Sequence, residues 1–262
     1  MPNGYFRQTA PPPLVPVRLD EGAAPIWCKL EFLNPSGSTK DRIAAYILSK
    51  AWQEGVIGRG SAVVEASSGS TSIAMAMVCA QMRLKFIAVM PEGVSAERVL
   101  MIRACGGEVQ FTPRAEGILG ALQRAAAVAQ VRNAFTPLQF ENPDNAAAHR
   151  FGTAVEIFRQ VPEGRVDAVV SGVGTGGTLV GLVDGCRDHG CAVTAVVARP
   201  VQAPDAGGSR GLTDAECCSF SSRIPGVVDQ LSRIYRPERM PRRMEIEVRD
   251  DGVGIPPEEI GR

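Results

Sequence analysis

Residues 34–42 read Asn34-Pro35-Ser36-Gly37-Ser38-Thr39-Lys40-Asp41-Arg42, and they are the most informative segment of the chain. This Pro/Ser/Gly turn leads into an apolar-periodic segment, residues 43–52, which predicts that a helix begins near Lys40. The free first-turn amides and the positive end of the helix dipole disfavour another positive charge there. We therefore expect Lys40 to lose its proton more readily than a solvated lysine, so that its amine can form a Schiff base with an aldehyde. Taken alone, a first-turn lysine is usually an ordinary solvated residue.

Two further loops contain glycine, and each lies between an apolar strand and a helical pattern. The first, Ser67-Ser68-Gly69-Ser70-Thr71, offers hydroxyls and free amides to a carboxylate. The second, Gly172-Val173-Gly174-Thr175-Gly176-Gly177-Thr178, can hold a phosphate through amides and threonine hydroxyls, without lysine or arginine. By themselves the first loop could be a plain helix cap and the second a tight turn. Neither a Walker lysine nor a Gly-x-Gly-x-x-Gly motif with a ribose-binding acid is present, which argues against a nucleotide.

Short apolar strands alternate with longer helical patterns through the middle of the chain. The predicted strands are 26–33, 61–66, 86–90, 108–112, 166–171 and 192–197, and the predicted helices are about 41–55, 70–82, 96–105, 115–131, 145–160 and 177–189. This order predicts an α/β fold whose mainly parallel sheets carry helices on both faces. Ligands bind at the carboxyl ends of strands in such sheets, which is where Gly37, Gly69 and Gly176 fall.

These segments resemble, in residues and in order, the motifs of the cysteine synthase and cystathionine β-synthase family of pyridoxal-phosphate enzymes. Residues 34–42 are similar to the family's lysine motif, and 65–71 to its substrate-carboxylate loop. Gln139-Phe140-Glu141-Asn142-Pro143-Asp144-Asn145 with His149 resembles its Gln-Phe-x-Asn-Pro-x-Asn segment, and 171–178 resembles its cofactor-phosphate loop. The resemblance extends over about residues 26–200.

The resemblance implies a tryptophan-synthase-β-like fold of type II, built from two three-layer α/β domains. Residues 37–139 would form the small, substrate-loop domain, and 1–36 with 140–262 the large, cofactor-phosphate domain. The implied cofactor is pyridoxal 5'-phosphate, joined to Lys40 as a Schiff base and contacted by Ser70, Gly174, Thr175, Gly176, Gly177 and Thr178. The implied substrate contacts are Ser67, Ser68, Gly69, Thr71 and Gln139.

The activity implied by the resemblance is β-replacement on an O-activated L-serine, in which sulfide or a thiol enters to give L-cysteine or a related amino acid. The family lysine at the place of Lys40 holds the cofactor and also moves the α-proton of the substrate. Two alternatives stay open: β-elimination from cysteine, and a pyridoxal-phosphate-binding or docking protein with impaired catalysis. We expect a homodimer, as is usual for the family.

The chain departs from the family pattern in two places. Ser70 and Ser72 stand where the family has Asn and Gly, so a ring contact that the Asn makes would here need a bridging water. Towards the C-terminus, 224–228 and 244–248 look like the beginning of the family's closing segment, and we expect the large domain to be incomplete at its C-terminus. Residues 250–257 resemble an ATP-binding box, but a surface turn is the expected structure.

Composition limits the other classes of function. Lysines and arginines number 28, as do aspartates and glutamates, so net charge does not point to nucleic acid or to an anionic membrane. No apolar run approaches the length of a membrane span, and we expect a cytoplasmic protein. The seven cysteines form neither a disulfide framework nor a metal-binding pattern, so no metal is expected.

Overall fold

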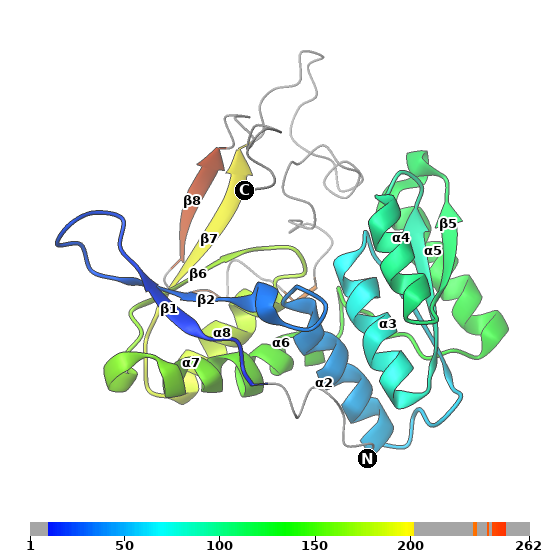
Figure 1. The fold of residues 1–262 in the computed structure, drawn as a ribbon, viewed down its shortest axis with the longest axis horizontal. Coiled ribbons are helices and arrows are strands. Elements are labelled where there is room, and N and C mark those ends of the chain that lie inside the picture. The colour runs from blue at the N-terminus through cyan, green and yellow to red at the C-terminus, as the bar shows by residue number, and fades with distance from the viewer. Residues whose placement is uncertain (1–9, 202–232, 235–239, 241–242, 250–262) are drawn as a thin grey trace, which may run out of the picture.

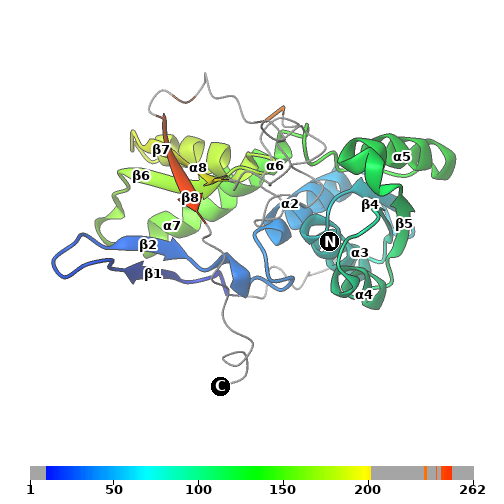
Figure 2. The ribbon, with the colours of Figure 1, turned by 90° about the horizontal axis from the view of Figure 1, so that it is seen from above.

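The computed structural model of this 262-residue chain describes residues 10–201, 233–234, 240 and 243–249. Two groups of α/β elements lie side by side, each around a parallel three-stranded sheet, and the helix α2 (Lys40–Gln53) runs between them (Figures 1 and 2). The C-terminal features expected at 224–228 and 250–257 lie outside the described residues.

The first sheet consists of β3 (Ala62–Ala66), β4 (Lys85–Pro91) and β5 (Glu108–Thr112), in that order. Alternate side chains of β3 and β4 point to opposite faces, as the two-residue repeat of a strand requires. One face packs against α3 (Ser70–Met82) and α4 (Ala96–Ala104), and α2 extends the same core from the far side of α3. The other face, with Val64, Ala66, Ile87 and Val89, packs against α5 (Gly117–Arg132). Both faces of this sheet are therefore covered, as predicted.

The helix α3 is buried on nearly all sides. Its sequence, STSIAMAMVCAQM, is rich in small and apolar residues and has no charged residue. A helix that is apolar all round is expected in the interior, and here α2 covers it on the side away from the sheet (Figure 1). The loop before α3 is therefore attached to one of the most enclosed elements of the fold.

The second sheet has the order β6 (Ala168–Gly172), β7 (Thr194–Val201) and β8 (Arg243–Arg249), and all its pairings are parallel. The helix α8 (Gly177–Asp188) packs on this sheet and on the helical segment 144–160. A Cβ at Gly181 would lie 2.3 Å from the carbonyl oxygen of Ala146, and one at Gly185 would lie 2.3 Å from Ala154 Cβ. Glycine at both positions lets the two helical segments pack closely.

An N-terminal hairpin and a cluster of charges hold the start of α2. The hairpin pairs β1 (Leu14–Val17) with β2 (Ile26–Lys29) in antiparallel fashion and continues into a 3-10 helix, η1 (Glu31–Leu33). The Arg42 guanidinium contacts Glu31 at 2.7 Å and Glu156 at 2.6 Å, and Lys29 contacts Glu156 at 2.8 Å. These partly buried ion pairs join the hairpin, α2 and the helix α7 (Ala154–Gln160).

The α/β fold with parallel sheets is confirmed, and three local predictions need correction. The strand predicted at 26–33 ends at Lys29, because β1 offers only four partner residues, and η1 follows. The helix predicted at 145–160 is divided into α6 (Asp144–Ala148), a π-helical turn (His149–Thr153) and α7. The strand β1 was not among those predicted, whereas the strand-like stretch at 244–248 is part of β8.

Candidate active site

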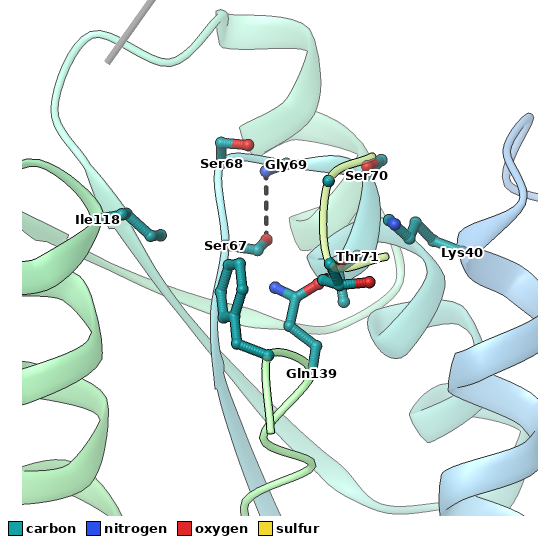
Figure 3. A pocket seen from close by; sticks show the side chains of 11 residues that line it. Lys40, Ser67, Ser68, Gly69, Ser70, Thr71, Ile118 and Gln139 are labelled. Carbon is teal, nitrogen blue, oxygen red and sulfur yellow. Dashed lines mark hydrogen bonds between the residues drawn. The ribbon is translucent and has the colours of Figure 1, made fainter. Parts of the chain in front are cut away.

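A pocket brings together residues from the four motif segments that resemble the family. It lies between the loops that follow β3 and β6, with the first residue of α2 beside them (Figure 3). Its lining consists of Lys40, Ser67, Ser68, Gly69, Ser70, Thr71, Ile118, Gln139, Phe140, Gly174 and Thr175. The parallel topology explains this meeting, because the carboxyl ends of the strands in each sheet point to the same side.

Lys40 is the first residue of α2, and its amine reaches toward the loop that carries Ser70 (Figure 3). Burial lowers the pKa of Lys40 to about 8, because the charged form loses hydration inside the fold. The direction is the one expected from the sequence, but desolvation is the cause, whereas the sequence argument relied on the helix dipole. Within the described residues the amine makes no ion pair or hydrogen bond. The lowered pKa leaves about a tenth of it neutral at pH 7, far more than for a solvated lysine.

The turn before Lys40 is held by the next residue in the chain. The carboxylate of Asp41, which is 1% exposed, accepts hydrogen bonds from the backbone amide of Ser36 at 3.2 Å and from its hydroxyl. The backbone amide of Lys40 donates to Ser38 Oγ at 3.2 Å. These contacts fix the backbone on which the lysine side chain stands.

The loop 67–71 is shaped by serine hydroxyls. Ser67 Oγ accepts from the amides of Gly69 and Ser72, each at 3.2 Å, and it lies 2.6 Å from the hydroxyl of Ser72. Ser72 thus supports Ser67 from behind, at one of the two positions where the chain departs from the family pattern. Within the described residues the amides of Ser70 and Thr71 have no acceptor, so they can bind a carboxylate in the pocket.

Gln139 lies opposite that loop and is held by several hydrogen bonds. Thr71 Oγ1 donates to Gln139 Oε1 at 2.7 Å, and Gln139 Nε2 donates to the carbonyl of Ala66 at 2.9 Å. Asn145 Nδ2 donates at 2.8 Å both to the carbonyl of Gln139 and to Thr175 Oγ1. Asn145 therefore connects the Gln139 side of the pocket with the loop after β6.

The loop 174–178 begins α8, and its first helical residue, Gly177, is buried, whereas Ser70 at the start of α3 is exposed. Gly176 has a φ of 78°, a conformation that favours glycine, and a Cβ at Gly177 would lie 1.8 Å from Asn145 Oδ1. The amides of Thr178 and Leu179 have no acceptor within the described residues. Free amides at a helix N-terminus suit a phosphate, so this loop meets the requirement that was inferred for it.

His149 supports the same loop from the π-helical turn. Its Nε2 lies 3.2 Å from Thr178 Oγ1 and its Nδ1 lies 2.9 Å from Thr153 Oγ1. Burial, with the charges of Lys40 and Arg42, lowers the pKa of His149 to about 3. The imidazole is therefore neutral at physiological pH and can orient the hydroxyl of Thr178.

The structure places the predicted residues in two groups and adds several that the sequence reasoning missed. Lys40, 67–71, Gln139, Gly174 and Thr175 line the pocket, whereas Gly176, Gly177 and Thr178 form the helix start behind them. Phe140 and Asn145 belong to a quoted motif but were not assigned to the site. Membership of that motif could have identified both residues. Glu65 could also have been noticed, because a charged residue within an apolar strand is unusual. No sequence pattern pointed to Ile118, because it reaches the pocket only through the packing of α5.

The donors in this pocket fit pyridoxal phosphate. The amine of Lys40 can react with an aldehyde, the first-turn amides of α8 can hold a phosphate, and the loop 67–71 can hold an amino-acid carboxylate. Among the described residues no helix is long and apolar enough to cross a membrane, and no group of His, Cys, Asp or Glu side chains has the arrangement of a metal site.

Known proteins of similar sequence and structure were found. A sequence profile of the family described as "Pyridoxal-phosphate dependent enzyme" matches residues 6–262. A cysteine synthase of Staphylococcus aureus (strain Mu50 / ATCC 700699) is 42% identical over 172 residues, which are 65% of this chain and 56% of that protein. The match thus spans little more than half the length of this curated relative.

Two solved structures are similar to this one. The cysteine synthase of Entamoeba histolytica has a TM-score of 0.77 at 28% identity, and the alignment covers 94% of this chain and 72% of that one. A hydrogen sulfide-producing enzyme of Fusobacterium nucleatum has a TM-score of 0.79 at 28% identity, with 92% and 72% covered.

Proposed function

This chain belongs to the family of pyridoxal-phosphate-dependent enzymes, and on that premise we propose that it catalyses β-replacement on an O-activated L-serine. Sulfide or a thiol would replace the activated oxygen, which gives L-cysteine or a related amino acid. The observation that carries the proposal is the Lys40 amine, whose pKa is lowered to about 8 and which faces the loop 67–71 across the pocket (Figure 3). The 42% sequence identity with a cysteine synthase over 172 residues supports this choice of reaction.

Three parts of the pocket would bind the cofactor. Lys40 would hold the aldehyde carbon, the start of α8 from Gly174 to Thr178 would hold the phosphate, and Ser70 would lie beside the ring. Bound pyridoxal phosphate supplies an electron sink that stabilises a carbanion at the α-carbon of an amino acid. The neutral imidazole of His149 would keep the hydroxyl of Thr178 directed toward the phosphate without adding a charge.

The substrate would be held by the opposite wall. The amides of Ser70 and Thr71 and the side chain of Gln139 suit its carboxylate, since amides at a helix start favour an anion. Lys40 Nζ is also the group proposed to take the α-proton, because a base with a pKa near the working pH transfers protons efficiently. Ile118 and Phe140 would exclude water from this end of the pocket.

A second candidate is β-elimination from L-cysteine, which releases sulfide. It is favoured by the likeness to the hydrogen sulfide-producing enzyme of Fusobacterium nucleatum. Ser70, which replaces the Asn of the family pattern, lines the pocket, and Ser72, which replaces the Gly, supports Ser67 from behind. Both substitutions would therefore bear on the balance between the two reactions. The third alternative, a cofactor-binding or docking protein without turnover, predicts cofactor binding and neither reaction.

We further propose the domain division and the assembly expected from the sequence. Residues 37–139 would form the small domain, 1–36 with 140–262 the large one, and two copies would form a homodimer. The small domain would contribute Lys40 and the loop 67–71, and the large one the phosphate loop. Size-exclusion chromatography with light scattering tests the dimer.

One set of measurements on the purified protein tests the proposal. Loading with pyridoxal phosphate should give a visible absorbance band that borohydride abolishes, and mass spectrometry should then find the pyridoxyl group on Lys40. Cysteine formation from O-acetylserine and sulfide should exceed sulfide release from cysteine alone. The reverse order would support elimination, and a bound cofactor with neither reaction would support the binding role. A pyridoxyl group on Lys29, Lys50 or Lys85 would contradict the assignment of Lys40 as the cofactor-binding lysine.

A further inference from the structure

Glu65 is a buried carboxylate in the middle of an apolar strand. The strand β3 reads Ala62-Val63-Val64-Glu65-Ala66, and Glu65 is 3% exposed. Within the described residues its carboxylate forms no ion pair with a lysine, arginine or histidine. Burial raises the pKa of Glu65 to about 7, which reflects the cost of placing this charge in the interior. A costly residue of this kind, next to a ligand pocket, calls for a functional explanation.

The carboxylate of Glu65 holds the backbone of a neighbouring segment. One oxygen accepts from the amide of Ala66 at 2.9 Å, and the other accepts from the amide of Gln139 at 3.1 Å. The amide of Leu138 also faces this carboxylate. Leu138 has a φ of 53°, which is unfavourable for a residue other than glycine and persists only where the surroundings enforce it. Glu65, which binds the next amide in the chain, helps to enforce it, together with the amides of Glu141 and Asn142, which bind the Leu138 carbonyl at 2.9 and 2.8 Å.

The segment held in this way presents the side chain of Gln139 to the pocket. Its amide bridges the carbonyl of Ala66 and the hydroxyl of Thr71, and both Gln139 and Thr71 line the pocket. Glu65 itself is not in the lining. It can therefore influence a ligand only through the residues that it positions.

We propose that Glu65 is a positioning residue for the amino-acid subsite: by binding the amides around Gln139 it sets the Gln139 side chain against Thr71, and so shapes the wall that receives the substrate carboxylate. This inference rests on the proposed function, since it assumes an amino acid in this pocket. The phosphate end of the cofactor, at the start of α8, lies outside the set of residues that Glu65 contacts.

The test uses the pyridoxal-phosphate-loaded protein and its Glu65→Gln variant. Glutamine keeps the shape but places an NH₂ group against a backbone donor, so one amide loses its acceptor. Titration with L-serine, O-acetylserine and L-cysteine, followed through the absorbance of the bound cofactor, measures how strongly each amino acid engages the pocket, and L-serine, whose hydroxyl is not activated, gives the affinity without loss of a leaving group. We expect roughly tenfold weaker amino-acid binding. The dissociation constant of pyridoxal phosphate, measured by fluorescence on reconstitution, should stay within about twofold.

A double-mutant cycle separates positioning from general structural damage. In a Gln139→Ala background the residue that Glu65 positions is already missing, so Glu65→Gln should weaken amino-acid binding by less than about twofold further. Equal losses in both backgrounds would show that Glu65 acts by another route and would overturn the inference. The inference would also be overturned if Glu65→Gln weakened the binding of pyridoxal phosphate and not that of the amino acids.

Leu138→Gly keeps the test valid if Glu65→Gln alone does not fold. Glycine adopts the observed φ without strain, and Leu138 is exposed, so this background should tolerate the change at position 65. The comparison is then Leu138→Gly with and without Glu65→Gln, and unchanged amino-acid affinity overturns the inference. If the parent protein itself responds to none of the three amino acids, the proposed function fails and this inference fails with it. A response in the parent that Glu65→Gln leaves unaltered removes only the role of Glu65.

Discussion

The two helix-start loops of the pocket have the same plan but differ in the exposure of the residue that begins the helix. Each follows a parallel strand, contains a glycine with positive φ (Gly69 or Gly176), and leaves two amides without an acceptor within the described residues. In the loop before α3, however, Ser70 is exposed and most of the loop lines the pocket. In the loop before α8, Gly176 and Gly177 are buried.

This difference indicates how one pocket can serve two ligands. An open helix start allows a ligand to enter and leave, as a substrate must. An enclosed one, with its backbone packed against Asn145, fits a group that stays bound. Lys40 stands beside both loops, and the predictions below test each side of this division.

The largest effect is expected for Lys40→Ala. Without the amine the protein loses both the covalent attachment of the cofactor and the proposed base, so turnover should fall on the order of a thousandfold or more. The fold should be retained, because the Lys40 amine makes no hydrogen bond or ion pair within the described residues. Steady-state rates and circular dichroism are the measurements. Lys85→Ala, at an exposed lysine, is the control and should change neither.

A pair of glycine substitutions addresses the comparison directly. In Gly177→Ala the new Cβ would clash with Asn145, so the loop must shift and pyridoxal-phosphate affinity should fall roughly a hundredfold. In Gly69→Ala the new Cβ meets Arg98, and the side chain there can move, but the φ of 153° is strained. That variant should weaken amino-acid binding and keep the cofactor. Equal loss of cofactor in both variants would contradict the assignment of the two loops.

The pH dependence of stability tests the burial of Lys40. Its pKa is about 8 in the folded protein and 10.5 when unfolded, so between these values the unfolded state binds more protons. The free energy of unfolding of the cofactor-free parent should therefore rise from pH 8 to 10.5, relative to Lys40→Met, by up to about 3 kcal/mol. Urea unfolding at several pH values measures this. Parallel pH profiles for parent and variant would mean that the amine is solvated.

The smallest effect is expected for Ser70→Asn. Ser70 is exposed, and the longer side chain restores the residue of the family pattern, which we expect to contact the cofactor ring without a bridging water. Pyridoxal-phosphate affinity should increase about threefold, the scale of one modest hydrogen bond. Fluorescence titration is sufficient. Weaker cofactor binding would show that the serine is needed at this position and that the ring lies elsewhere.

Sequence reasoning located the pocket through loops but could not supply the contacts behind them. The sequence placed the glycines of 34–42, 67–71 and 172–178 where strands lead into helices. The structure bears this out for 67–71 and 172–178, whereas 34–42 follows η1 and a strand of the antiparallel hairpin. All three segments nevertheless contribute residues to the pocket. The hydrogen bonds of Gln139 with Thr71 and of Asn145 with Thr175 join residues 68 and 30 positions apart, respectively. No local pattern specifies such pairs, because they depend on how the helices pack.

The sequence by itself determined the alternation of strands and helices, the helix start at Lys40 and the family, since periodicity, glycine placement and motif order are local properties of the chain. Tertiary structure alone decided the environment of individual groups. The pKa of Lys40 is lowered and that of Glu65 is raised because packing removes water from both, and the distances that set those shifts arise only when 40, 65 and 138–139 are brought into one interior. Hydration is lost through neighbours that are distant in the sequence, and for that reason the chemistry of this site became visible only in the folded chain.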